Sequence, residues 1–203
     1  MRALVFDLDG TLLHFEEGYD EVIREAIEHA GGDASEETLE RYLEAFFEHF
    51  SRCEPDPVQR GFEATDLEVD PQTLADSLLT QEVERARTPE GALADLERLS
   101  ETHAIGVLTN GVRSWQERKL EAHGFGGVVD AFVASYEVGA HKPTRGPFAE
   151  LEDRLPATAY AMIGDSDSDV DGADAVGWES HRYTGGGFGG LPDTLEWGED
   201  DRP

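Results

Sequence analysis

The chain has 203 residues, a length that suits one core domain with a modest insertion. It carries 45 acidic residues against 16 lysines and arginines, so its formal net charge at pH 7 is −29. A field this negative repels nucleic-acid backbones and anionic lipid surfaces, so we expect neither nucleic acid nor a membrane as a partner. The composition suits a protein kept soluble in very high salt, and we therefore predict halophilic adaptation.

Cysteine usage and apolar runs indicate the compartment. Cys53 is the single cysteine, so an intramolecular disulfide cannot form, which fits a reducing cytoplasm. The apolar residues near the N-terminus stop at Asp7, and no apolar run is long enough to span a bilayer. We therefore expect a cytoplasmic protein, either monomeric or weakly homodimeric.

Four short apolar runs predict buried strands at residues 3–6, 105–108, 131–134 and 160–163. Each run is continuous instead of alternating, which is typical of strands covered on both faces of a parallel sheet. Helical patterns accompany them, from Thr88 to about Ser100 and from Ser114 to about His123. This alternation predicts an α/β fold with a Rossmann-like, doubly wound parallel sheet.

Residues 14–87 interrupt the alternation with helical periodicity, most clearly over 22–30, 39–50 and 74–79. We predict a small helical cap over 14–87, inserted into a core made of 1–13 and 88–203. The aromatic stripe over 42–50 is interpreted as helix packing and not as a cofactor site. The tail from 185 to 203 is rich in Gly and acidic residues, and its glycine run at 185–190 predicts a flexible loop.

Polar side chains stand at the end of each predicted strand, where the ligand crevice of such a sheet lies. In chain order they are Asp7 and Asp9, Thr109 and Asn110, Lys142, and Asp165 with Asp169. Taken singly, the two N-terminal aspartates also fit solvated turn residues, and residues 109–111 fit an ordinary Asn-Gly turn.

Lys142 is harder to explain as a surface residue, because only Lys119 and Lys142 are lysines in the whole chain. A compact ammonium that contacts phosphate or a carboxylate as a point charge explains why one was kept. Lys119 has Arg118 and Glu121 close by in the predicted helix, and we interpret it as a surface residue.

The acidic segment 167–172 also matches the beginning of an EF-hand calcium loop. The twelfth position of that loop would be Trp178 where a bidentate Glu is required, and the segment follows a predicted strand. A non-catalytic calcium-binding protein is therefore a minor alternative.

Taken together, four motifs resemble those of the haloacid dehalogenase superfamily, in the same order. They are Asp-x-Asp-Gly-Thr-Leu at 7–12, Thr-Asn-Gly at 109–111, Lys-Pro at 142–143 and Gly-Asp-Ser-x-x-Asp at 164–169. The insertion after the first motif resembles the helical cap of the phosphoglycolate-phosphatase-like branch. The resemblance implies a Mg²⁺-dependent phosphatase that hydrolyses a small phosphorylated metabolite.

The resemblance also implies a role for each matching residue. Asp7 would be the nucleophile and Asp9 the acid–base partner, while Thr109, Asn110 and Lys142 would bind phosphate. Asp7, the backbone carbonyl of Asp9, and Asp165 would ligate Mg²⁺, and Asp169 would bind the metal or orient its ligands. With Mg²⁺ and Lys142 beside it, Asp7 is expected to keep a low pKa.

Other members of the superfamily supply the competing hypotheses. A phosphosugar mutase uses the same aspartate pair, whereas a metal-independent haloacid dehalogenase has no Asp at the position of Asp9. In the cap, we considered substrate contact for five residues, each of which is more commonly an ordinary surface residue. They are His14, Phe15, Tyr19, Arg52 and Arg60.

The net charge leads to a prediction about salt. Because acidic self-repulsion is screened only at high ionic strength, we expect circular dichroism to show lost structure when the protein is moved from molar salt to dilute buffer. An unchanged spectrum in dilute buffer would count against halophilic adaptation.

Overall fold

The computed structural model describes residues 1–195 and 197. The chain divides into two compact units, Met1–His14 with Thr88–Pro203 and Phe15–Arg87. The predicted division differs from these units only in the assignment of His14. Residues 196 and 198–203, which belong to the Gly-rich, acidic tail, lie outside the described residues.

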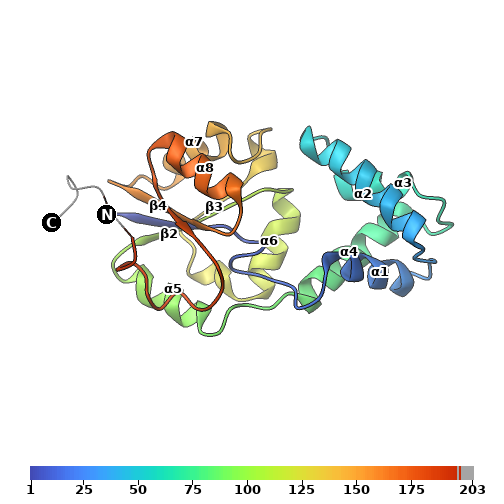
Figure 1. The fold of residues 1–203 in the computed structure, drawn as a ribbon, viewed down its shortest axis with the longest axis horizontal. Helices are drawn as coiled ribbons and strands as arrows, with labels where there is room; N and C mark the ends of the chain where they lie inside the picture. Colours follow the sequence, from blue (N-terminus) through green and yellow to red (C-terminus); the bar gives the residue numbers. More distant parts are fainter. Residues whose placement is uncertain (196, 198–203) are drawn as a thin grey trace. The chain divides into compact units, whose positions relative to one another are not determined.

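The first unit is built on a five-stranded parallel sheet with strand order β3-β2-β1-β4-β5 (Figure 1). The strands are β1 (Ala3–Phe6), β2 (Ala104–Thr109), β3 (Ala131–Ala134), β4 (Tyr160–Gly164) and β5 (Glu179–Arg182). Phe6 at the end of the central strand pairs with Val107 of β2 and Ile163 of β4. The predicted doubly wound α/β fold is confirmed.

The sequence analysis did not predict the fifth strand, β5. Its sequence is Glu-Ser-His-Arg, its residues are half-buried or exposed, and it pairs with β4 at the edge of the sheet. An edge strand needs no continuous apolar run, so the pattern that predicted the other four strands is absent from this one.

Helices cover both faces of the sheet. They are α5 (Ala92–Ser100), α6 (Arg113–Ala122), α7 (Arg145–Arg154) and α8 (Asp167–Val176), with short 3₁₀ turns η1 (Phe125–Gly127) and η2 (Ser135–Glu137). Figure 1 shows α7 and α8 together on one face and α5 on the other. Under α7 and α8 the core includes Val5, Phe148, Leu151 and Trp178.

Two local predictions are corrected by these helices. The helix expected from Thr88 begins at Ala92, because Gly91 takes a left-handed φ of +75° and Ala92 N–H donates to Pro89 in a turn. Residues 167–172 form the first turns of α8 and not a loop, so the calcium-loop hypothesis is wrong.

The second unit contains α1 (Tyr19–His29), α2 (Glu36–Ser51), α3 (Pro57–Glu63) and α4 (Pro71–Arg85). Ser35 and Asp70 cap the N-termini of α2 and α4 by accepting backbone N–H bonds at 3.1 and 3.0 Å. The aromatic stripe packs through Tyr42, which is 1% exposed and whose ring centroid lies 4.3 Å from that of Phe62. No helix in the described part of the chain combines the length and apolar character that a bilayer span requires.

The glycine-rich segment after β5 is fixed to the sheet, contrary to the flexible loop that we predicted. Phe188 is 2% exposed and meets Phe6 edge-to-face with ring centroids 5.1 Å apart. Its backbone N–H donates to Asp95 at 2.9 Å, and Arg98 donates to its carbonyl at 3.3 Å. One buried aromatic side chain and two charged residues of α5 therefore anchor the segment.

This anchoring predicts that Phe188→Ala lowers the free energy of unfolding by about 3 kcal/mol or more, the usual cost of truncating a buried phenylalanine. Urea denaturation in high salt measures it. Phe47→Ala removes a phenylalanine that is 58% exposed and serves as the matched control, with an expected change of about 0.5 kcal/mol or less. Equal effects of the two substitutions would show that the segment is not anchored.

Candidate active site

The predicted site residues gather at the carboxyl edge of the sheet. Asp7 directly follows β1, Thr109 is the last residue of β2, and Asp165 directly follows β4. Lys142 lies between η2 and α7, and Asp169 lies in the first turn of α8. Parallel strands end at one edge, which is why segments far apart in sequence meet here.

Asp7 and Lys142 form a buried ion pair. The Lys142 Nζ donates to Asp7 Oδ1 at 2.7 Å and to the Leu108 carbonyl at 2.7 Å. It also lies 2.6 Å from Asp169 Oδ1. The exposed fractions are 7% for Asp7, 4% for Lys142 and 0% for Asp169. One ammonium therefore faces two carboxylates away from water.

The expectation of a low pKa for Asp7 is not met in the protein without a bound cation. Burial is the largest influence and raises the pKa of Asp7 from 3.8 to about 7, because the attraction of Lys142 does not offset it and Asp169 adds repulsion. Burial lowers the pKa of Lys142, but Asp7 and Asp169 outweigh it, so this pKa is raised and Lys142 stays charged.

Asp165 lies close to the first motif because position 10 is a glycine, and a side chain there would fill the space that Asp165 occupies. A Cβ on Gly10 would lie 2.4 Å from Asp165 Oδ2, and Gly10 has a φ of +93°, which side chains disfavour. The buried Thr11 hydroxyl donates to Asp165 Oδ1 at 3.0 Å. From β5, Arg182 donates to the Asp165 carbonyl at 2.7 Å, so the unpredicted edge strand fixes this loop.

Three carboxylates can be reached by one cation. Asp7, Asp165 and Asp169 each place an oxygen within 4.8 Å of the others. An all-oxygen, anionic donor set suits a hard divalent cation such as Mg²⁺. Asp169 is the most occupied of the three: its Oδ2 accepts from Ser166 N–H at 3.1 Å and Oγ at 2.6 Å. These bonds favour Asp169 as the residue that orients the loop around the cation.

The second motif is held by side chains on both sides. The Asn110 amide accepts from Lys142 N–H at 2.9 Å and donates to the Lys142 carbonyl at 3.3 Å. Its side chain therefore positions Lys142, and phosphate binding by Asn110 stays a prediction. Thr109 is 1% exposed, and its hydroxyl accepts from Gln116 Nε2 at 3.3 Å.

The surface interpretation of Lys119 is wrong. Lys119 is 3% exposed, and its Nζ donates to both carboxylate oxygens of Asp9, at 2.7 and 2.8 Å. Gln116, which we had not considered, donates from Nε2 to Asp9 Oδ2 at 2.7 Å. The two residues are three apart in α6 and so share one face, a spacing that is visible in the sequence.

Three of the proposed cap contacts are already bonded inside the second unit. Tyr19 donates to Glu82, Arg52 donates to Glu48, and Arg60 donates to the Pro55 carbonyl. Phe15 packs beside Tyr19 with ring centroids 5.7 Å apart, and His14 belongs to the first unit. Substrate contact by these residues stays a prediction.

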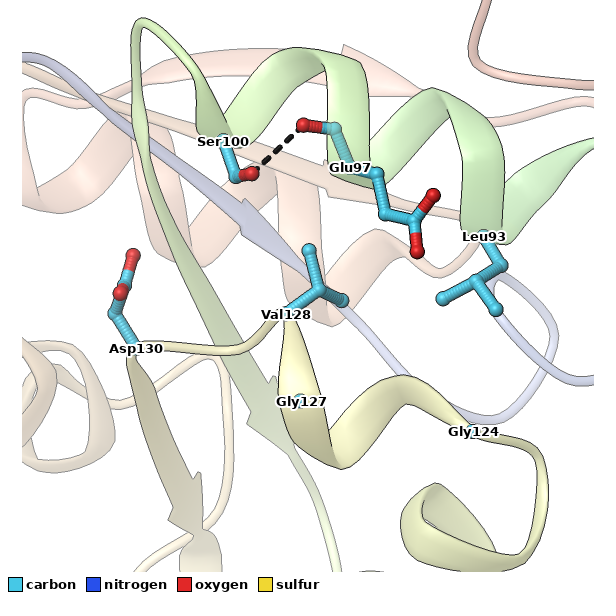
Figure 2. Close-up of a pocket in the computed structure, with 7 residues that line it drawn as sticks. All are labelled: Leu93, Glu97, Ser100, Gly124, Gly127, Val128 and Asp130. Carbon is cyan, nitrogen blue, oxygen red and sulfur yellow. Dashed lines mark hydrogen bonds between the residues drawn. The ribbon is translucent and has the colours of Figure 1, made fainter.

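A cavity of about 370 Å³ lies elsewhere in the first unit, between α5 and the segment that leads into β3 (Figure 2). Its lining includes Leu93, Glu97, Val128 and Asp130 and shares no residue with the acidic cluster. Asp130 holds the start of β2 by accepting from Ile105 N–H at 2.9 Å. The cavity therefore adds nothing to the site at the carboxyl edge.

The pKa of Asp7 predicts a pH-dependent stability effect in metal-free protein. A carboxyl whose pKa is higher in the folded state contributes most below about pH 4, and that contribution is lost as the pH rises through about 7. Between about pH 5 and pH 8, we expect the stability of Asp7→Asn relative to wild type to rise by about 3 kcal/mol at most. Chemical denaturation with a chelator in high salt measures it.

The control for this experiment is Asp171→Asn, which makes the same change at an exposed position of α8. Its stability relative to wild type should be the same at both pH values. A constant difference for Asp7→Asn as well would contradict the raised pKa of Asp7.

Comparison with known proteins identifies the family to which the chain belongs. The model of the haloacid dehalogenase-like hydrolases matches residues 1–177. The chain is 31% identical over 185 residues to ribulose-1,5-bisphosphate 5-phosphatase of Halopiger xanaduensis, covering 88% of this chain and 71% of the relative.

Solved structures support the same assignment. A HAD phosphatase from Thermococcus onnurineus aligns with a TM-score of 0.68 and 27% identity, over 91% of this chain and 86% of that one. The magnesium-bound HAD-hydrolase YfnB of Bacillus subtilis shares the fold, with a TM-score of 0.70 and 22% identity over 88% of this chain and 86% of its own. The four ordered motifs, the sheet and the family match together show that this chain belongs to the haloacid dehalogenase-like hydrolase family.

Proposed function

We propose that the protein is a Mg²⁺-dependent phosphatase that hydrolyses a small phosphorylated metabolite through an aspartyl-phosphate on Asp7. The observation that carries the proposal is the placement of two aspartates with different surroundings. Asp7 is buried against Lys142, whereas the Asp9 side chain is 40% exposed and held by Lys119. One carboxylate is thus suited to attack phosphorus and the other to exchange a proton.

In the first step, an Asp7 oxygen attacks phosphorus and the ester P–O bond breaks. The leaving oxygen takes a proton from Asp9, and the phosphoryl group remains on Asp7. Lys142, which bonds Asp7 at 2.7 Å, offsets the repulsion between the anionic nucleophile and the anionic ester. Thr109 and the backbone N–H groups after β2 contribute donors to the phosphoryl oxygens.

In the second step, Asp9 removes a proton from water as the water oxygen attacks phosphorus. The P–O bond to Asp7 breaks, inorganic phosphate leaves, and Asp7 returns as a carboxylate. Asp9 ends the cycle protonated again, so the two steps balance in protons.

Mg²⁺ would be held by Asp7, Asp165 and the Asp9 carbonyl, with Asp169 as a ligand or orienting residue. When bound, it supplies positive charge that neutralises the phosphoryl oxygens. This local charge matters because the net charge of −29 opposes the approach of any anionic substrate.

The relative from Halopiger xanaduensis acts on ribulose 1,5-bisphosphate by its name. Its identity of 31% supports a small phosphorylated substrate for this chain without fixing which one. Asp9 disfavours metal-independent dehalogenation, because that reaction needs no acid–base carboxylate at this position. A phosphosugar mutase would use the same pair, and a sugar-phosphate isomer assay with a bisphosphate activator separates it from hydrolysis.

The test of the proposal is phosphate release from p-nitrophenyl phosphate and a metabolite panel in high-salt buffer with Mg²⁺. We expect Asp7→Asn to lose activity by about 10³-fold or more, since the nucleophile is removed. The exposed Asp171→Asn should match wild type. Activity retained by Asp7→Asn would rule out the covalent mechanism.

Cation binding provides a measurement that is independent of turnover. Mg²⁺ should raise the Tm of wild type, because it binds the folded state, and should raise it less in Asp165→Asn. An equal Tm shift in both proteins would remove Asp165 from the proposed ligands.

A further inference from the structure

Lys119 is a buried cation without a role in the mechanism above. Both lysines of the chain are buried, and each donates to one of the two aspartates of the first motif: Lys142 to Asp7 and Lys119 to Asp9. Arg118, the neighbour of Lys119 in α6, is exposed. Burying an ammonium is costly, so its position against one particular carboxylate needs an explanation beyond solubility.

The contact between Lys119 and Asp9 restricts rotation. The terminal torsion of an aspartate is broad, so a carboxylate that is 40% exposed would otherwise sample many orientations. Lys119 Nζ lies within 2.8 Å of both oxygens and fixes the position of the carboxylate, while Gln116 Nε2 bonds Oδ2 alone at 2.7 Å and so opposes rotation of its plane. This is the kind of fixation that a proton-transferring group requires.

Gln116 ties the same carboxylate to the second motif. Its Nε2 donates to Asp9 Oδ2 at 2.7 Å, to the Asn110 carbonyl at 3.0 Å and to Thr109 Oγ1 at 3.3 Å. The Asn110 carbonyl and an ionised Asp9 carboxylate can only accept, so the amide NH₂ faces them. A Cβ on Gly111 would lie 2.7 Å from this nitrogen, so the glycine of the motif leaves the space that Gln116 occupies.

We infer that Lys119 and Gln116 are positioning residues for the acid–base reaction, which hold the Asp9 carboxylate in a fixed orientation beside the end of β2. The inference rests on the proposed phosphatase function and deepens it. Neither residue needs to touch the substrate, and the effect of each passes through Asp9.

The inference makes a step-specific prediction. With p-nitrophenyl phosphate, the leaving group departs as a stable anion and needs no proton, so formation of the aspartyl-phosphate does not depend on Asp9. Hydrolysis of the aspartyl-phosphate still requires Asp9 to remove a proton from water. Loosening Asp9 should therefore slow the second step and leave the first nearly unchanged.

The experiment is rapid-mixing kinetics of Lys119→Met with p-nitrophenyl phosphate, in high salt with saturating Mg²⁺. We expect release of about one equivalent of p-nitrophenolate per chain at a rate within about threefold of wild type, followed by turnover slowed by about tenfold to a hundredfold. Acid-quenched samples should contain phosphorylated protein. Gln116→Met should show the same pattern more weakly, since Lys119 still bonds both Asp9 oxygens.

Three variants act as controls. Arg118→Met makes the same kind of change at an exposed position one residue away and should match wild type. Asp9→Asn should reproduce the accumulation of phosphorylated protein, and adding Lys119→Met to it should change the rate of the second step by less than about twofold. Lys119→Arg keeps the charge and should restore part of the second step.

Two results would overturn the inference. One is a Lys119→Met protein with wild-type rates in both steps. The other is a burst amplitude reduced in proportion to the steady-state rate, because a purely structural role lowers the active fraction and affects both steps equally. Failure of the proposed function looks different, since wild type would then release no Mg²⁺-dependent p-nitrophenolate and Asp9→Asn would form no phosphorylated protein.

Discussion

Burial of the Asp7 charge is the constraint on which the site depends. A carboxylate shielded from water at the end of the central strand is stable only with a counter-charge, and Lys142 provides it at 2.7 Å. In the metal-free protein this single ammonium is insufficient, and the pKa of Asp7 is raised to about 7. In the mechanism that we propose, Asp7 would therefore be more fully ionised once a cation binds, and its readiness to attack would depend on cation binding.

In the loop after β4, single side chains likewise serve both the fold and the site. Asp169 accepts from Ser166 at the N-terminus of α8 and at the same time lies 2.6 Å from Lys142 Nζ. The Asp169 side chain thus both caps the start of α8 and contributes to the electrostatics around Asp7. Gly10 gives Asp165 room to approach, and Arg182 holds the Asp165 carbonyl from the edge strand. Fold and site are consequently difficult to alter independently in this region.

Much of this could be predicted from sequence, and the failures have physical causes. Continuous apolar runs identified the four inner strands, and motif order identified the family. The strand at Glu179–Arg182 was missed because a polar edge strand carries no burial pattern. Lys119 was misinterpreted because its sequence neighbours are charged, whereas helix geometry groups it with Gln116, three residues earlier, which is buried. The scarcity of lysine, which indicates a functional role for Lys142, is an equally strong argument for Lys119.

Arginine and lysine side chains lie in different parts of this protein, and the difference has a practical consequence. Arginine provides the cation in most of the ion pairs outside the site, such as those of Arg41 and Arg154, whereas both lysines are buried within the site. An amine-reactive reagent therefore meets no accessible lysine side chain in the folded protein. Lysine acylation, followed by mass spectrometry, would report the opening of this one site against a background free of surface lysines.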